Sequence, residues 1–274
     1  MATQHEANNM ALFCDFENVA IGVRDAKYEK FDVRKVLEHL LLKGSIVVKK
    51  AYCDWDRYKT FKPAMHEAAF ELIEIPHVRM SGKNSADIRM VVDALDLCYT
   101  KSHVDTFVII SGDSDFSPLV SKLRENNKMV IGVGVKQSSS DLLISNCDEF
   151  IYYDDLVREK SKKQGRKKPA ATAALTAAPE TVKASASDAD KKQEAIDLVM
   201  ETVEALTAER GAEEKIWGSM VKQALKRRKP GFNESYYGFR SFSKLLEEAE
   251  ARKLLALQHD EKSGGVIIQS FSSD

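Results

Sequence analysis

Between Met10 and about Lys160, short apolar segments alternate with longer stretches whose apolar residues recur at helical spacing. This alternation is typical of a parallel sheet covered by helices, because each parallel strand returns through a crossover connection that is usually helical. The first expected helix starts at an Asp32 N-cap and ends before Gly44. We predict strands at 10–15, 45–53, 70–75, 105–111, 129–134 and 149–153, and further helices at 59–69, 85–99, 116–126 and 139–145. The expected fold of this part is a doubly wound α/β domain.

The chain changes character after this domain. Residues 158–192 are rich in Ala, Ser, Thr and Lys and contain no aromatic residue, so we predict a flexible linker. Its first part, 158–168, holds seven basic residues against one Glu, which suits either a solubilising tether or a contact with nucleic acid. Residues 193–270 then show three helical patterns and two short strand patterns joined by a turn at 262–265, the outline of a small winged-helix domain.

Composition excludes several classes of protein. Lys and Arg number 41 against 42 Asp and Glu, so the overall charge of −1 does not indicate a polyanion partner. The four cysteines lie too far apart in sequence for a zinc knuckle or a redox pair. Neither a basic and apolar leader nor an apolar run of about 20 residues occurs, so we expect a cytoplasmic protein without a membrane span.

Acidic residues directly follow two of the predicted strands. Strand 10–15 ends at Asp15, with Asn18 just beyond it, and strand 105–111 is followed by Asp113 and Asp115. A further acid, Asp87, lies at the start of the predicted helix 85–99. Ligands of open parallel sheets bind outside the carboxyl ends of the strands, where the winding direction reverses, so these side chains are expected to converge.

Each of these acids alone is explained by a helix cap or a turn. Together they would repel one another in a partly desolvated cleft, a cost that a bound cation offsets. Hard oxygen ligands without nearby His or Cys favour Mg²⁺ or Mn²⁺ over zinc, and such a site suits phosphodiester hydrolysis. Asp93 lies about 240° around the helix from Asp87, so we expect it on the helix face or behind the site, with Asp96 in solvent.

Four segments together carry a family resemblance: "LFCDFENV", "SADIRMVVDAL", "FVIISGDSDFSPLVSKLRENNKMVIGVG" and "SDLLISNCDEFIYYDDL". In this order and spacing they resemble the NYN domain of the LabA type, a PIN-like nuclease fold, over about residues 10–157. The resemblance implies a metal-dependent ribonuclease with Asn18 orienting water, metal or phosphate. The acids that it implies as catalytic residues and metal ligands are Asp15, Asp87, Asp113 and Asp115. Phe16 stands where family members often carry Gly, so the rim of the cleft is expected to differ from theirs.

Other polar residues near these acids have two interpretations each. Ser111 and Ser114 would bond the phosphate or brace the carboxylates. Lys136 with Ser138–Ser140 would position phosphate, or the serines would simply start a helix. Arg79 and Lys83, just before Asp87, would contact the RNA backbone or belong to a solvated loop.

The C-terminal part has its own cationic segment. Residues 215–229 contain six basic residues and no acid, beside the aromatic-rich segment 231–243. Cations for phosphates and ring faces for bases are what RNA binding requires, although the aromatic spacing also suits packing of a small core. The predicted RNA-binding residues are Lys222, Lys226, Arg227, Arg228, Lys229 and Arg240.

This C-terminal part also resembles a known domain. The block "YGFRSFSKLLE" with the later "GGVIIQ" is similar to the OST-HTH or LOTUS domain, a winged-helix fold, over about residues 194–270. The resemblance implies binding of RNA, including structured or G-rich RNA, or recruitment of a protein partner. The whole sequence therefore predicts a metal-dependent ribonuclease with a tethered RNA-binding domain. A non-catalytic RNA-binding adaptor and a nucleotide phosphatase are the alternatives.

Overall fold

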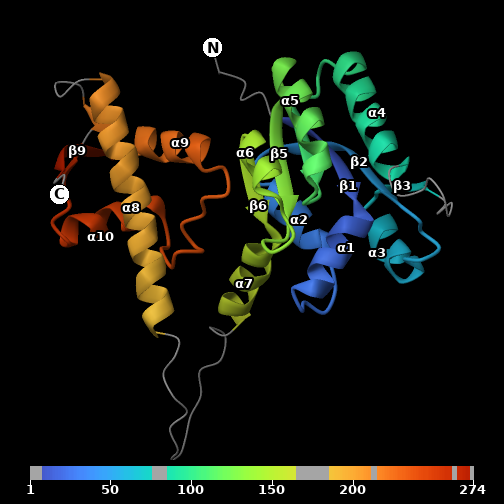
Figure 1. Ribbon diagram of the computed structural model, residues 1–274, viewed down its shortest axis with the longest axis horizontal. Coiled ribbons are helices and arrows are strands. Elements are labelled where there is room, and N and C mark those ends of the chain that lie inside the picture. The colour runs from blue at the N-terminus through green and yellow to red at the C-terminus, as the bar shows by residue number, and fades with distance from the viewer. Residues whose placement is uncertain (1–7, 76–84, 165–184, 211–214, 261–263, 272–274) are drawn as a thin grey trace, which may run out of the picture. The chain divides into compact units, whose positions relative to one another are not determined.

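The computed structural model describes residues 8–75, 85–164, 185–210, 215–260 and 264–271, with no side chains described for 159–188 or for residue 210. The chain forms two compact units, 1–164 and 165–274. Figure 1 shows the N-terminal unit in blue to yellow-green and the C-terminal unit in orange and red. Among the described helices, none has the length and apolar character needed to cross a membrane.

A six-stranded parallel sheet forms the centre of the N-terminal unit, as the alternating sequence pattern predicted. The spatial order is β3-β2-β1-β4-β5-β6, so the winding direction reverses between β1 and β4. The strands are β1 (Asn9–Asp15), β2 (Ser45–Cys53), β3 (Glu71–Glu74), β4 (Thr106–Ile110), β5 (Met129–Gly134) and β6 (Glu149–Tyr152). The carboxyl ends of β1 and β4 therefore meet at the switch point of the sheet.

Helices cover both faces of this sheet. On one face, side chains of α1 (Phe16–Asp25), α2 (Val33–Leu40), α3 (Lys62–Glu67) and α7 (Tyr153–Gln164) share a core with alternate strand residues. On the other face, α4 (Ser85–Thr100), α5 (Ser117–Glu125) and α6 (Asp141–Asn146) build a second core. In Figure 1, α4 and α5 lie above the sheet and α1 and α3 below it. The doubly wound α/β fold is thus confirmed.

The central strands have no solvent-facing side. Residues Met10 to Cys14 of β1 and Phe107 to Ile110 of β4 are fully buried. Strands buried on both faces consist of continuous apolar runs, which explains why their positions were readable from the sequence. Short 3₁₀ turns, η1 (Lys59–Phe61) and η3 (Ser114–Phe116), precede α3 and α5.

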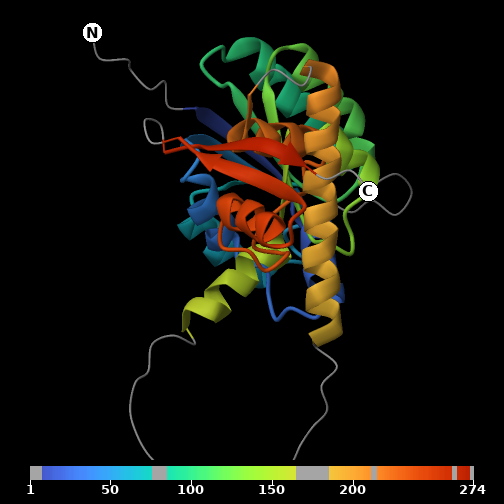
Figure 2. The same ribbon diagram turned by 90° about the vertical axis from the view of Figure 1, so that its left-hand side faces the viewer.

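The C-terminal unit packs three helices against a small antiparallel sheet. The helices are α8 (Ser185–Arg210), α9 (Gly218–Arg228) and α10 (Phe242–Ala251), and the sheet order is β7-β9-β8. Its strands are β7 (Ile216–Trp217), β8 (Leu255–His259) and β9 (Val266–Phe271). Figure 2 shows the two red strands of the β8–β9 hairpin crossing beside the orange helix α8. Three helices and this hairpin form the expected winged-helix outline.

Three details differ from the sequence-based expectations. Helix α1 was not expected, because it follows β1 without an intervening turn. Helices α7 and α8 extend into both ends of the segment assigned to a flexible linker, so residues 158–164 and 185–192 are helical. Ile216 was assigned to a helix but forms strand β7, where it pairs with Ile268.

Candidate active site at the carboxyl edge of the sheet

Three segments distant in sequence bring acidic side chains to the switch point. Asp15 is the last residue of β1, and Cys14 beside it is paired with Ile110, the last residue of β4. Asp113, three residues after the end of β4, therefore lies near the end of β1. Asp87, in the first turn of α4, lies close enough for its charge to raise the pKa of Asp15.

Asp15 is the most deeply buried of these acids, with 7% of its surface exposed. Ser111 donates its hydroxyl hydrogen bond to Asp15 Oδ2 at 3.0 Å, and the Asn18 N–H donates to Oδ1 at 3.3 Å. Burial raises the pKa of Asp15 to about 7, and the charges of Asp87 and Asp113 add to this effect against the two hydrogen bonds. Asp15 therefore titrates close to neutral pH when no cation is bound.

Asp87 experiences the same acidic surroundings from the helix side. Its pKa is raised to about 6, chiefly by partial burial and in addition by the carboxylates of Asp113, Asp115 and Glu17. All charged neighbours that raise the pKa values of Asp15 and Asp87 within this site are thus carboxylates. The site holds an excess of negative charge that a cation would stabilise.

Asp113 and Asp115 have different local roles. Asp113 caps the turn η3, accepting the N–H of Asp115 on Oδ1 at 3.0 Å. The Asp113 N–H donates in turn to Ser111 Oγ at 3.2 Å, so Ser111 connects Asp15 with Asp113. The expectation that Ser111 braces the carboxylates agrees with these contacts. Asp115 is exposed, and Asp113, not Asp115, accepts the hydrogen bond at the start of this turn.

Asn18 holds the two loops of the site together. Its Oδ1 accepts the Gly112 N–H at 2.9 Å, which joins the start of α1 to the loop after β4. Gly112 has no space for a side chain, because a Cβ there would lie 2.4 Å from the backbone oxygen of Ser138. The amide oxygen of Asn18 is therefore engaged within the protein.

The described residues do not form a closed metal shell. In that part of the chain, no group of three or more His, Cys, Asp or Glu side chains is arranged so that it could hold a metal ion. The acids nevertheless lie close enough to shift one another's pKa, and carboxylate oxygens are the ligands that Mg²⁺ and Mn²⁺ take. The donor chemistry fits a divalent cation, which would have to draw these carboxylates closer together.

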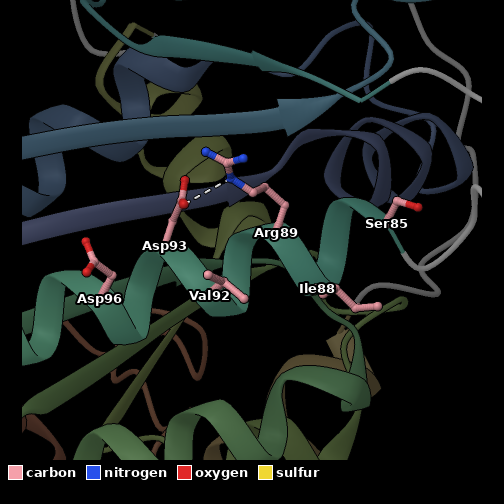
Figure 3. A pocket seen from close by; sticks show the side chains of 6 residues that line it. All are labelled: Ser85, Ile88, Arg89, Val92, Asp93 and Asp96. Carbon is pink, nitrogen blue, oxygen red and sulfur yellow. Dashed lines mark hydrogen bonds and ion pairs between the residues drawn. The ribbon is translucent and has the colours of Figure 1, made fainter.

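Asp93 faces away from this acidic site, as its helical position predicted. Its carboxylate accepts hydrogen bonds from Tyr52 Oη at 2.9 Å, Lys50 Nζ at 3.3 Å and Arg89 Nε at 3.0 Å. Figure 3 shows Arg89 and Asp93 pointing toward one another along α4. They belong to the lining of a groove of about 570 Å³, together with Ser85, Ile88, Val92 and the exposed Asp96. None of the four site acids is among these lining residues.

The serines after β5 support the fold. Ser140 caps α6 by accepting the Leu142 N–H at 3.2 Å, and Ser139 donates to the Val135 carbonyl at 2.8 Å. The helix-start interpretation therefore agrees with the contact of Ser140, whereas Ser139 bonds the loop before the helix. Lys136 lies over the Tyr152 ring, 5.8 Å from its centroid. Arg79 and Lys83 lie outside the described residues.

The cationic residues of the C-terminal unit divide into two groups. Lys222 pairs with Glu234 at 2.7 Å, and Arg228 pairs with Glu201, so both are engaged in ion pairs. The remaining predicted RNA-binding residues are the half-buried Lys226 and the exposed Arg227, Lys229 and Arg240. Phe239 and Phe242 are buried in the core of this unit together with Phe232, as the packing interpretation predicted, whereas Tyr236 is half-buried.

Sequence reasoning missed two sets of cations. Lys191 and Lys192 were assigned to the linker, but they lie on α8 over Tyr236 and Phe239, at 5.5 and 5.9 Å from the ring centroids. Arg57, in the turn after β2, pairs with Glu17 at 2.9 Å beside the acidic site. Its position beside Glu17 follows from the strand order, for which the sequence carries no local signal.

Comparison with known proteins identifies the N-terminal unit. A sequence profile of the NYN domain matches residues 9–154, which include all four site acids. The chain belongs to the NYN domain family. NYN domains are generally PIN-like nucleases, which hydrolyse phosphodiester bonds and typically use divalent metals.

Two known proteins are similar to part of this chain. An uncharacterized protein of Methanocaldococcus jannaschii, MJ0482, is 29% identical over 140 residues, which are 50% of this chain and 55% of that protein. The chain thus matches about half the length of this curated relative. A protein of unknown function from Vibrio parahaemolyticus, VPA0982, is similar in its crystal structure, with 27% identity and a TM-score of 0.50. The similarity covers 57% of this chain and 98% of that one, so it supports the fold.

Proposed function

We propose that this chain is a divalent-metal-dependent ribonuclease whose NYN domain hydrolyses RNA phosphodiester bonds, and that it acts in the cytoplasm. The observation that carries the proposal is the convergence of four carboxylates at the switch point of the sheet. Burial, to which their mutual repulsion adds, raises the pKa of Asp15 to about 7 and that of Asp87 to about 6. A cluster with this excess negative charge suits a bound cation, which in turn attracts a phosphate, better than it suits a structural role.

The burial and contacts of each site residue suggest its role. Asp15, Asp87 and Asp113 would hold Mg²⁺ or Mn²⁺, which activates water and stabilises negative charge on the phosphate when bound. Ser111 and the Asn18 N–H hold Asp15 in one orientation, at 3.0 and 3.3 Å. Asp115 is the most solvent-exposed acid of the four, and we assign to it the proton that the attacking water releases.

The C-terminal unit is proposed to be an OST-HTH or LOTUS domain that captures RNA. Exposed Arg227, Lys229 and Arg240 would contact phosphates, and the pairing of Lys191 with the Tyr236 ring places a cation beside an aromatic face. An RNA held by a tethered domain is present at high local concentration near the NYN domain. Capture of a protein partner is the alternative role of this unit.

Cleavage of an end-labelled RNA by Asp113→Asn and Asp25→Asn tests the proposal. Asp113→Asn should lower cleavage in Mn²⁺ at least 100-fold and leave RNA binding within threefold of the parent. Asp25 is an exposed acid on α1 paired with Arg24, so Asp25→Asn should cleave like the parent. Parent protein that cleaves none of several RNAs in either metal would instead indicate an adaptor. Faster turnover of mononucleotides than of oligonucleotides would indicate a phosphatase.

A further inference from the structure

One cation stands at the rim of the acidic site. Arg57 Nη1 lies 2.9 Å from Glu17 Oε1, and Glu17 is in the first turn of α1, two residues after Asp15. Arg57 belongs to the turn after β2, and Tyr52 near the end of β2 is the strand partner of Asp15. The parallel register thus delivers Arg57 to the β2 side of the site, opposite the β4 side that carries Asp113.

The turn that carries Arg57 is held firmly. Trp55 is buried, its backbone N–H donates to Glu74 Oε1 at 2.9 Å, and its indole N–H donates to the Ile73 carbonyl at 3.2 Å. The Arg57 N–H donates to the Asp54 carbonyl at 3.1 Å. The backbone position of Arg57 is therefore fixed before any ligand arrives, which lowers the entropic cost of using its side chain in binding.

The ion pair itself adds little stability. The side chains of Arg57 and Glu17 are 51% and 35% exposed, and exposed pairs of this kind typically contribute below about 1 kcal/mol. A guanidinium has five N–H donors in a planar fork that matches a phosphate, and the contact with Glu17 involves one of its three nitrogens. A phosphate that approaches the carboxylates also needs a positive group to offset their repulsion.

We propose that Arg57 binds a backbone phosphate of the RNA that flanks the scissile phosphate, and that Glu17 orients its guanidinium for this contact. The inference rests on the proposed function, since it assigns a phosphate subsite to the same cleft. Nearby cations pair with other acids: Lys59 of η1 and Lys62 of α3 with Asp56, and Arg24 of α1 with Asp25. Arg24 is thus a matched control, an exposed arginine near the end of the helix whose first turn contains Glu17.

Steady-state cleavage by full-length Arg57→Ala, Arg57→Lys and Arg24→Ala provides the first test. Arg57→Ala should raise KM about 10-fold or more with kcat within threefold of the parent. Arg57→Lys should recover part of this loss, because it keeps the charge and loses the fork. Arg24→Ala should stay within twofold of the parent. Equal kinetics for Arg57→Ala and Arg24→Ala would overturn the inference.

RNA with single neutral methylphosphonate linkages identifies the phosphate. One substitution beside the cleavage site should raise the KM of the parent about as much as Arg57→Ala does, with no further effect on Arg57→Ala. Additive losses at every linkage would contradict a direct contact.

Equilibrium binding separates this inference from the proposed function. If the parent does not cleave RNA, the proposed function fails, and binding of the same oligonucleotide then decides on Arg57. Binding of the oligonucleotide should depend less on salt in Arg57→Ala than in Arg24→Ala. The slope of log K against log salt concentration should differ by about 0.7. Identical slopes for the two variants would refute the phosphate contact.

Discussion

Replacing Asp15 by Asn should stabilise the NYN domain at neutral and higher pH while abolishing its function. The pKa of Asp15 is raised from 3.8 to about 7, so the native state holds a proton that the unfolded chain releases between these values. The native state is therefore relatively stable below pH 4, and this contribution is lost as the pH rises through 7. The difference corresponds to roughly 4 kcal/mol at pH 8.

Asn removes the charge and keeps one oxygen for the Ser111 hydroxyl or the Asn18 N–H, but its amide group then needs a new partner. We therefore expect a net gain of about 1–3 kcal/mol for Asp15→Asn at pH 8 without metal, and no gain at pH 4. Urea unfolding with chelator, followed by Trp55 fluorescence, measures this gain. Trp217→Phe in all variants removes the signal of the C-terminal unit.

Asp25→Asn serves as the control for this experiment, because Asp25 is exposed, and its free energy of unfolding should change by less than about 0.5 kcal/mol. The reasoning would be refuted if Asp15→Asn were less stable than the parent by the same amount at pH 4 and pH 8. That result would mean that the hydrogen bonds of Asp15 outweigh its burial and its acidic neighbours.

Three further outcomes are expected. Saturating Mn²⁺ should raise the melting temperature of the parent more at pH 8 than at pH 5 in calorimetry. At the lower pH, protons compete with the metal for Asp15 and Asp87, whose pKa values are about 7 and 6. Asp93→Ala should cost about 2–4 kcal/mol in urea unfolding, since it removes from Tyr52 and Lys50 a carboxylate that is only 11% exposed, while Asp96→Ala should cost under about 0.5 kcal/mol. Gly112→Ala should lower kcat for RNA at least 10-fold, because a Cβ there would lie 2.4 Å from the Ser138 oxygen and displace the loop that carries Asp113.

The strands and the site acids were largely readable from the sequence for the same reason. Strands buried on both faces are uninterrupted apolar runs, so a polar residue at the end of one, such as Asp15 or Asp113, is conspicuous. Helix α1 was missed because Asp15 is both the last residue of β1 and the N-cap of the helix. No turn residue separates the two elements, so no boundary signal exists there.

The sequence does not indicate which side chains from other segments lie beside the end of each strand. Arg57 lies beside Glu17 because β2 is next to β1 in the sheet, and strand order is a property of the assembled fold. Lys191 was placed in a linker because its surroundings in sequence are polar, whereas its ring contact with Tyr236 comes from a segment over 40 residues away. Local composition does not report such long-range contacts.

Ser138 meets two glycines from different elements, and the two contacts would behave differently in a genetic suppressor search. A Cβ on Gly22 of α1 would lie 2.4 Å from the Ser138 hydroxyl oxygen, whereas a Cβ on Gly112 would lie 2.4 Å from the Ser138 backbone oxygen. Ser138→Gly removes the first obstacle and leaves the second. Loss of function from Gly22→Ala should therefore revert through a second change at position 138, while Gly112→Ala should revert only at its own codon.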